Sequence, residues 1–378
     1  MADAPLGIYI HLPFCTGKCP YCGFNSRPAR PGEVETYLAA LRREFELRLE
    51  EGATADTVYF GGGTPTIAPP RLLADLLQAL AARVRFAGDP EFTLEAHPES
   101  LTRERLRDLR AAGFNRISIG AQSDDDAVLR ALGRRHDAAR ASGAVEDARA
   151  AGWDNVSLDL IFGAPGQSLR RWIATLERAI ALRPEHISTY GLTVEPGTEF
   201  HRRQDAGEVL GVGEEAELAM YSAAREILRA AGYEHYEISN FALPGKRCRH
   251  NEKYWRGGDY LGLGAGAHSS AGGVRWANAP DPARYAALLE RDALPVAYAE
   301  RLSAARRMEE QLILELRTAE GACLAELGGR FGRDALREYR STIAELAGAG
   351  LVRHEGSRVA LTGDGMALAN EVAVRVIS

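Results

Sequence analysis

Short runs of β-branched and aromatic residues alternate with longer amphipathic segments over the first two-thirds of the chain. The short runs have the length and composition of strands. They are Leu6–His11, Thr57–Phe60, Glu91–Ala96, Asn115–Gly120, Asn155–Phe162 and His186–Leu192. Between them, apolar residues three and four positions apart predict helices, among them Val34–Leu49, Arg71–Val84, Thr102–Ala112 and Leu169–Leu182.

Strands that alternate with helices predict an α/β fold with a parallel sheet, because helical crossovers connect parallel strands. Six such units are fewer than the eight of a closed barrel, so we expect an open, partial (β/α)6 barrel of TIM-like type. Chemistry in such folds gathers at the carboxyl ends of the strands. The unusual residues of this chain follow the predicted strands at those ends: Cys15–Cys22, Gly61–Pro65, Glu95, Gln122, Asp159 and Tyr190.

The pattern changes after Gly232. Tyr233–Ser239 is predicted to form one more strand, and a glycine- and aromatic-rich stretch follows it. From about Ser303 the periodicity predicts three helices and a hairpin, at Ala305–Arg317, Cys323–Phe331, Arg333–Ala349 and Val352–Leu361. We therefore expect a barrel over residues 1–232, a barrel-closing segment over 233–302, and a small winged-helix-like domain over 303–378.

Composition narrows the class of protein. The chain has 378 residues, of which 46% are hydrophobic, and a formal net charge of -6, so nonspecific attraction to nucleic acid is not expected. The start lacks the basic and apolar regions of a secretory leader, and no apolar run approaches the ~20 residues that span a bilayer. Three of the five cysteines fall within eight residues, which favours a metal or cluster site in a reducing, cytoplasmic setting.

The segment Cys15-Thr16-Gly17-Lys18-Cys19-Pro20-Tyr21-Cys22 carries the clearest chemical signal. A [4Fe–4S] cluster is normally held by four thiolates. Three cysteines on one tight loop would bind three irons and leave the fourth open to chelation by a ligand with amino and carboxylate groups. A structural zinc loop is the alternative, although zinc sites commonly pair two C-x-x-C units and have a fourth protein ligand.

The strand upstream, the C-x-x-x-C-x-x-C spacing and the aromatic residue before the last cysteine resemble the radical SAM superfamily. The segments Tyr9–Phe14 and Cys19–Ser26 resemble the corresponding segments of one branch of that superfamily. This branch contains oxygen-independent coproporphyrinogen III oxidase and a related heme chaperone. The resemblance implies a radical SAM barrel that binds a [4Fe–4S] cluster and S-adenosyl-L-methionine (SAM). It places SAM contacts at Tyr9, Tyr21, Gly62, Gly63, Thr64, Glu95, Gln122, Arg134 and Asp159, with Gly191 a further candidate.

Two of these side chains also attract attention on physical grounds. Glu95 ends a predicted strand, and Asp159 lies in an apolar run of a strand that we expect to be covered on both faces. A buried charge is costly unless it is paired or bound to a ligand, so both acids are expected to face a ligand. The alternative is burial beside an arginine.

Three features separate the two members of that branch. The oxidase has a fourth cysteine where this chain has Phe24, and a longer segment ahead of its cluster, whereas fourteen residues precede Cys15 here. The chain also matches an H-N-x-x-Y-W motif associated with heme binding in the chaperone. The residues are His250, Asn251, Tyr254 and Trp255.

In this interpretation His250 ligates heme iron, the aromatic residues cover the porphyrin, and Arg247 and Arg249 meet the propionates. Cys248 is a second candidate for contact with iron, whereas Cys323 is expected to be a small core residue in a helix. The alternative is that His250 caps a loop and the aromatic residues close the open barrel.

The leading hypothesis is therefore a heme chaperone that delivers heme to an acceptor protein of a membrane or respiratory chain. The alternative is an enzyme that decarboxylates coproporphyrinogen to protoporphyrinogen, so enzyme activity stays open. The resemblance also implies an electron donor and a homodimer. In the carboxy-terminal domain, Arg333, Arg337 and Arg340 are mixed with acids, which favours packing or protein docking over DNA binding.

Overall fold

The computed structural model describes residues 4–50 and 52–377. Its main element is a mixed sheet of 12 strands. In spatial order these are β14 (Val296–Arg301), β13 (Val274–Asn278), β12 (His268–Ala271), β11 (Tyr260–Leu263), β1 (Leu6–Leu12), β4 (Ala53–Gly62), β5 (Val84–Ala96), β6 (Arg116–Gln122), β7 (Val156–Phe162), β8 (His186–Gly191), β10 (Asn240–Ala242) and β9 (Glu234–His235). All six predicted strands of the barrel are present, as β1 and β4–β8.

The six strands lie side by side and run parallel, which confirms the predicted fold class. The order of strands within the described residues has two separate ends, β14 and β9, so the barrel is open. A further parallel strand, β11, pairs with β1 and was not predicted. The remaining strands at both ends are antiparallel.

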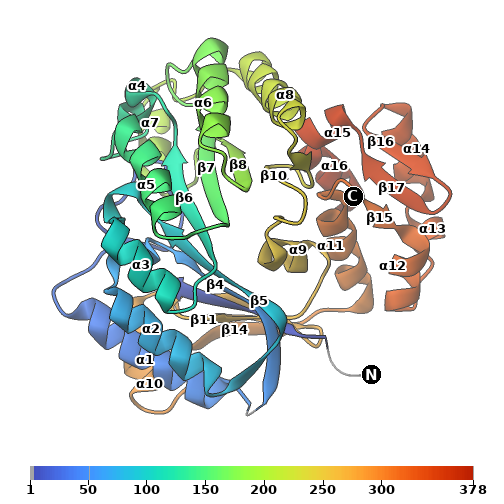
Figure 1. Ribbon diagram of the computed structural model, residues 1–378. Helices are drawn as coiled ribbons and strands as arrows, with labels where there is room; N and C mark the ends of the chain where they lie inside the picture. Colours follow the sequence, from blue (N-terminus) through green and yellow to red (C-terminus); the bar gives the residue numbers. More distant parts are fainter. Residues whose placement is uncertain (1–3, 51, 378) are drawn as a thin grey trace.

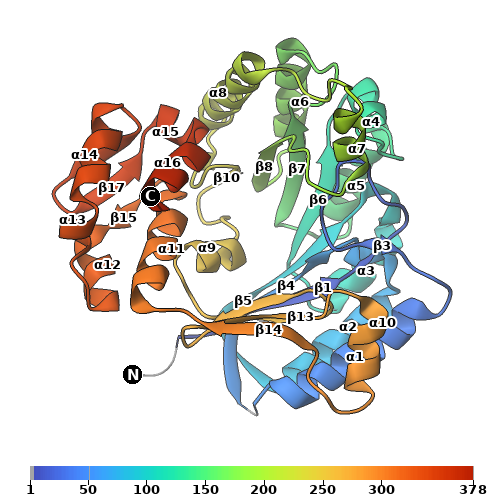
Figure 2. The same ribbon diagram turned by 180° about the vertical axis from the view of Figure 1, so that it is seen from behind.

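Helices cover the outer face of the curved sheet, as Figures 1 and 2 show from opposite sides. They are α1 (Glu33–Arg48), α2 (Pro70–Ala81), α3 (Arg103–Ala111), α4 (Asp126–Ala131), α5 (Ala138–Ala150), α6 (Leu169–Ala181), α7 (Glu199–Asp205), α8 (Glu214–Ala230) and α10 (Pro282–Leu289). The predicted helix Arg71–Val84 is too long at its end, because Val84 already starts β5. Of the helices that the structure describes, none combines the length and hydropathy that crossing a bilayer demands.

The two faces of the central strands differ in polarity. On β6, Ile117, Ile119 and Ala121 are buried in the core, whereas Arg116 and Ser118 point to the inner face and line a cavity. Side chains alternate between the faces of a strand, so this difference follows directly from the sequence. Asp159 was expected on a strand covered on both faces. Instead, helices cover the outer face of the sheet (Figure 1), and Asp159 lines the cavity on the inner face.

Residues 233–302 contribute to both ends of the main sheet. Strands β9 and β10 extend it beside β8, and β11–β14 extend it beside β1. Between β10 and β11 the chain forms α9 (Arg249–Trp255), which contacts β4 and α11 (Ala304–Leu316). Figure 1 shows α9 at the open side of the curved sheet, next to the carboxy-terminal helices. The segment thus extends the sheet instead of closing it strand to strand.

The carboxy-terminal domain has the predicted order of three helices and a hairpin, with added elements. Its parts are α11, β15 (Ala322–Cys323), α12 (Leu324–Phe331), α13 (Ala335–Glu338), α14 (Arg340–Gly348), β16 (Val352–Glu355), β17 (Arg358–Leu361), α15 (Gly363–Ala367) and α16 (Ala369–Ile377). The single helix predicted for Arg333–Ala349 is broken at Tyr339, whose side chain is buried. Cys323 is half-buried in β15, not in a helix, and contacts Ser357 Oγ at 3.4 Å.

Candidate functional site

A cavity of about 440 Å³ lies against the inner face of the curved sheet, within the usual size of small-molecule sites. The cysteine loop and strands β4–β8 contribute most of its wall. The predicted site residues that line it are Cys15, Cys19, Tyr21, Cys22, Gly63, Thr64, Glu95, Gln122, Arg134, Asp159, Gly191 and Asn251. The structure therefore brings the three cysteines together with most of the predicted SAM contacts.

Five predicted residues do not line this cavity: Tyr9, Gly62, His250, Tyr254 and Trp255. Tyr9 lies behind the wall, where its hydroxyl is 3.0 Å from His11 Nδ1 and its ring stacks on Tyr59 at 6.1 Å. The backbone N–H of Gly62 donates to Glu95 at 3.2 Å. Tyr9 and Gly62 thus support residues that face the cavity.

The three cysteines lie on one loop that is held at both ends. Cys15 ends the short strand β2 (Phe14–Cys15), which pairs with β3 (Arg27–Pro28) after the loop. Within the loop, the backbone N–H of Cys22 donates to the carbonyl of Cys19 at 3.1 Å. All three thiols are free and half-buried.

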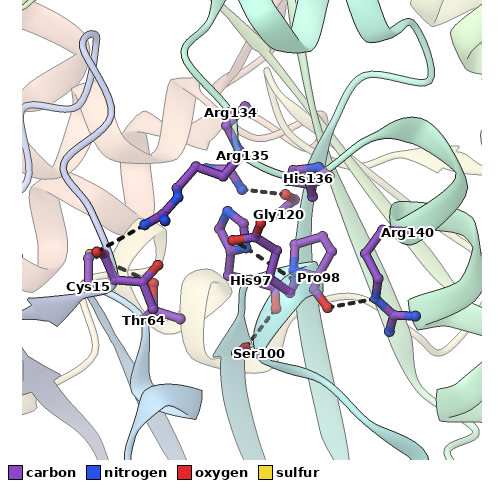
Figure 3. A network of polar contacts seen from close by, with 12 residues as sticks. Cys15, Thr64, His97, Pro98, Ser100, Gly120, Arg134, Arg135, His136 and Arg140 are labelled. Atoms are coloured by element: carbon purple, nitrogen blue, oxygen red, sulfur yellow. Dashed lines mark hydrogen bonds and ion pairs between the residues drawn. The ribbon is translucent and has the colours of Figure 1, made fainter.

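Two side chains from the barrel contact the sulfurs, as Figure 3 shows for Thr64 and Cys15. Thr64 Oγ1 donates to Cys15 Sγ at 3.7 Å, and Arg134 Nη1 donates to Cys19 Sγ at 3.5 Å. Burial raises the pKa of the Cys15 thiol above its ordinary value. The hydrogen bond from Thr64 opposes this effect and favours the thiolate form of Cys15.

The three thiols lie together on the wall of one cavity. Among the residues that the structure describes, no three His, Cys, Asp or Glu side chains are placed to hold a single metal ion. A cubane binds each thiolate at a different iron, so its ligands need not converge on one point. Three free thiols on the wall of one cavity therefore fit a [4Fe–4S] cluster.

The glycine run after β4 packs directly against the cysteine loop. A Cβ atom on Gly63 would lie 2.4 Å from the carbonyl oxygen of Phe14, next to Cys15. The backbone N–H of Gly63 donates to Leu12 at 2.8 Å, and that of Thr64 donates to Phe14 at 2.7 Å. Glycine is required here because two backbones approach closely. The run was predicted as a ligand contact, and the structure adds a role in positioning the cysteines.

Glu95 and Asp159 face the cavity from neighbouring parts of the inner face. Tyr59 donates to Glu95 Oε1 at 2.8 Å, and the Ser118 hydroxyl lies 3.0 and 3.1 Å from the two carboxylate oxygens of Asp159. Burial raises the pKa of Glu95 to about 7 and also raises the pKa of Asp159. Arg116 acts electrostatically on both acids without forming a direct ion pair with either, and both acids line the cavity, where a ligand can reach them.

Arg134 connects the end of β6 with the cysteine loop. Its Nη2 donates to the carbonyl of Gly120 at 2.8 Å, while Nη1 also lies 3.5 Å from the hydroxyl of Tyr21. Its Nε is buried without a hydrogen bond. At the end of the same strand Gln122 has a φ of 65°, which is unusual for a residue other than glycine and typical of functional sites. Both side chains are positioned to contact a ligand.

Several cavity residues were not singled out from the sequence as ligand contacts. They are Tyr59, His97, Arg116, Ser118, His186, Ser188 and Tyr190, of which only Tyr190 was noted as a polar strand end. A signal for most of them is present in the two-residue alternation. Arg116, Ser118, Gly120 and Gln122 alternate with apolar residues along β6, and His186, Ser188 and Tyr190 recur at every second position of β8.

The H-N-x-x-Y-W motif forms α9, and its side chains point in different directions. His250 is 1% exposed, with Nδ1 2.9 Å from Thr57 Oγ1 and Nε2 2.8 Å from the Tyr254 hydroxyl. Asn251 lines the cavity, whereas Trp255 packs against Tyr236. The motif thus fastens α9 to the inner face of β4 and presents one amide to the cavity.

The three residues before the motif are buried or form polar contacts within the protein. Cys248 is buried, and burial raises the pKa of its thiol to about 12. Arg247 forms ion pairs with Glu234, Glu252 and Glu320. Arg249 donates to the carbonyl of Asp89. Neither arginine lines the cavity.

The raised pKa of Glu95 predicts how stability depends on pH. In the protein without cluster or SAM, the carboxyl binds its proton more tightly when folded, with a pKa of about 7 against an ordinary 4.5. This stabilisation is complete below pH 4.5 and is lost as the pH rises to 7, a change of up to about 3 kcal/mol. A Glu95→Gln variant should therefore gain stability relative to the parent between pH 5 and pH 8.

Chemical denaturation at several pH values measures this gain. Glu104→Gln, a change on the exposed face of α3, is the control and should follow the parent at every pH. Parallel curves for the parent and Glu95→Gln would show that Glu95 does not titrate in this range.

Comparisons with known proteins place this site in a family. Residues 9–179 match the radical SAM superfamily, and residues 302–368 match the HemN C-terminal domain. The solved structure of coproporphyrinogen III oxidase (HemN) from Escherichia coli superposes with a TM-score of 0.88 over 99% of this chain and 90% of that chain. At 24% sequence identity this likeness supports the fold alone.

Relatives of higher sequence identity are named heme chaperone HemW and not oxidase. The heme chaperone HemW of Mycobacterium tuberculosis (strain H37Rv) is 40% identical over 377 residues, which are 98% of this chain and 95% of the relative. The heme chaperone HemW of Bacillus subtilis (strain 168) is 36% identical and covers 96% of this chain and 97% of its own. The Escherichia coli (strain K12) protein of that name is 41% identical over 70% of both chains. The chain therefore belongs to the radical SAM superfamily and, within it, to the family of the proteins named heme chaperone HemW.

Proposed function

We propose that the protein is a heme chaperone that binds heme and passes it to an acceptor protein. The observation that carries the proposal is the 40% identity over 98% of the chain with a relative named as such. The fold likeness to the oxidase does not favour that enzyme, because at 24% sequence identity it supports the fold alone. At the rim of the cavity Phe24, 67% exposed, stands where the oxidase branch has a further cysteine.

The proposal includes a [4Fe–4S] cluster on Cys15, Cys19 and Cys22. When bound and reduced, such a cluster supplies single electrons to SAM. Arg134, which already contacts Cys19, is placed to meet the carboxylate of SAM beside the cluster. The carboxylates of Glu95 and Asp159 offer acceptors for the ribose hydroxyls deeper in the cavity.

We propose that His250 ligates the heme iron. Asn251, Tyr254 and Trp255 would surround the bound heme. Burial lowers the pKa of His250 to about 3, so the imidazole is neutral and able to bind iron. Iron at Nε2 must displace the hydroxyl of Tyr254, which lies 2.8 Å away. Because the ring is 1% exposed, heme ligation also requires α9 to move away from β4.

Heme titration of the reconstituted protein tests the chaperone directly. We expect stoichiometric heme binding, followed by transfer to an apo-acceptor, and no conversion of coproporphyrinogen when SAM and a reductant are supplied. Multiple turnovers of coproporphyrinogen would overturn the proposal in favour of the oxidase. A His250→Ala variant should lose the heme absorbance of the parent, with His354→Ala on the exposed hairpin as its control. An unchanged spectrum would remove His250 as the ligand.

The partners of this function are further parts of the proposal. Heme delivery requires an acceptor protein, which we expect to be membrane-associated, and reduction of the cluster requires an electron donor. We also propose that the protein works in the cytoplasm and self-associates as a dimer. In the carboxy-terminal domain, Arg333 is paired with Glu338 at 2.8 Å and Arg306 with Glu309 at 2.7 Å. Such pairing supports protein docking and not phosphate binding.

A further inference from the structure

Arg116 is a buried cation at the floor of the cavity. It is the first residue of β6, is 2% exposed and contributes to the cavity lining. Gln122 ends the same strand six residues later, so the two lie about 20 Å apart along β6 at ~3.3 Å per residue. Arg116 is thus far from the end of the strand that approaches the cysteine loop.

The guanidinium of Arg116 has no direct partner in the described part of the chain. It has no ion pair within 4.0 Å and no side-chain hydrogen bond, and its Nε is buried without an acceptor. The buried acids Glu44, Glu91 and Glu237, by contrast, each accept several hydrogen bonds. Glu44, for example, accepts from Gly264 at 2.8 Å, Asn278 at 2.7 Å and Tyr285 at 2.6 Å. The charge of Arg116 is balanced by neighbouring groups such as Glu91, but its buried donors are unfilled, which is costly unless a ligand completes them.

The acids around Arg116 are committed to other donors. Glu91 accepts the backbone N–H groups of Arg249 and His250, both at 3.2 Å, and so caps the start of α9. Glu95 accepts from Tyr59 and Gly62, and Asp159 accepts from Ser118. These carboxylates reduce the local positive charge but do not fill the donor positions of Arg116. A ligand with a planar, bidentate acceptor would fill them.

We infer that Arg116 binds a carboxylate group of a ligand at the floor of the cavity. Asn251, which faces the same cavity from α9, is placed to add an amide donor. Heme carries such a group as a propionate, and SAM carries a single amino-acid carboxylate, which the proposed function places at Arg134 beside the cluster. Loss of SAM affinity in an Arg116 variant would therefore move that carboxylate from Arg134 to Arg116. The heme source rests on the proposed function, whereas the SAM source does not.

Binding measurements with Arg116→Gln and Arg116→Lys separate the two sources. The parent and both variants are titrated with heme, with heme dimethyl ester and with SAM. If a propionate is bound, Arg116→Gln weakens heme binding about 10- to 100-fold and leaves the ester unaffected. If the amino-acid carboxylate is bound, SAM affinity falls by that factor instead. Arg116→Lys keeps the charge and should restore part of the affinity in either case.

The control is Arg105→Gln on α3, which removes an arginine that donates to the carbonyl of Ala68 outside the cavity. It should bind both ligands like the parent. Unchanged affinity of Arg116→Gln for both heme and SAM would overturn the inference. A parent that binds no heme would refute the proposed function, while the SAM titration still tests Arg116. If Arg116→Gln fails to fold, Arg116→Lys decides the question. Loss of the bidentate guanidinium must still weaken the binding of either heme or SAM.

Discussion

A Cys19→Ala variant is expected to retain less than about one iron per chain after anaerobic reconstitution, where the parent holds about four. Cys15 and Cys22 would remain, but two thiolates are too few to hold a cubane. The other cysteines offer no substitute, because Cys248 is fully buried and Cys323 lies in β15 of the carboxy-terminal domain. Iron and sulfide analysis measures the loss.

The matched control for this experiment is Cys323→Ala. It removes a thiol whose recorded contact is Ser357, far along the chain from the cysteine loop, and should leave the iron content unchanged. A full cluster in Cys19→Ala, or equal losses in both variants, would contradict the assignment of the three ligands.

Replacing Gly63 with alanine should have the second largest effect. The new Cβ would lie within 2.4–2.8 Å of three backbone atoms of Phe14, which leaves no flexible side chain to move aside. The cysteine loop must then shift away from β4, at an expected cost of about 3 kcal/mol in stability. We expect loss of the cluster and of SAM binding together. Thermal unfolding and iron content give the two readouts.

Gly211→Ala provides the comparison, since no atom lies within 4 Å of its added Cβ and its φ is not in the left-handed region. That variant should reconstitute and unfold like the parent. If Gly63→Ala binds a normal cluster with normal stability, then the close packing of the glycine run on the cysteine loop has no functional consequence.

The central sheet and the cysteine site were predictable because their signals are local. Each strand from β4 to β8 is followed by its own helix, so periodicity alone gives their order and direction. The polar inner face was also present in the sequence, as Arg116, Ser118 and Gln122 alternate with buried residues on β6. Arg116 was not singled out from the sequence, but the structure places it in the cavity.

Other features depend on contacts between distant segments, which periodicity does not report. Strand β11 joins β1 through pairs such as Tyr9 with Gly262, and no local pattern specifies this neighbour. The same holds for His250, since the motif identified the residue but not its contacts with Thr57 and Tyr254. Such pairings are decided by tertiary packing.

The most direct test of the account is electron paramagnetic resonance of the anaerobically reconstituted and reduced protein, before and after addition of SAM. Three thiolates leave one iron accessible, so we predict a [4Fe–4S] signal that SAM changes in the parent. In Arg134→Gln, which lacks the proposed partner of the SAM carboxylate, this change should require more SAM. Purified protein that carries zinc, or a cluster whose signal is indifferent to SAM, would contradict the account.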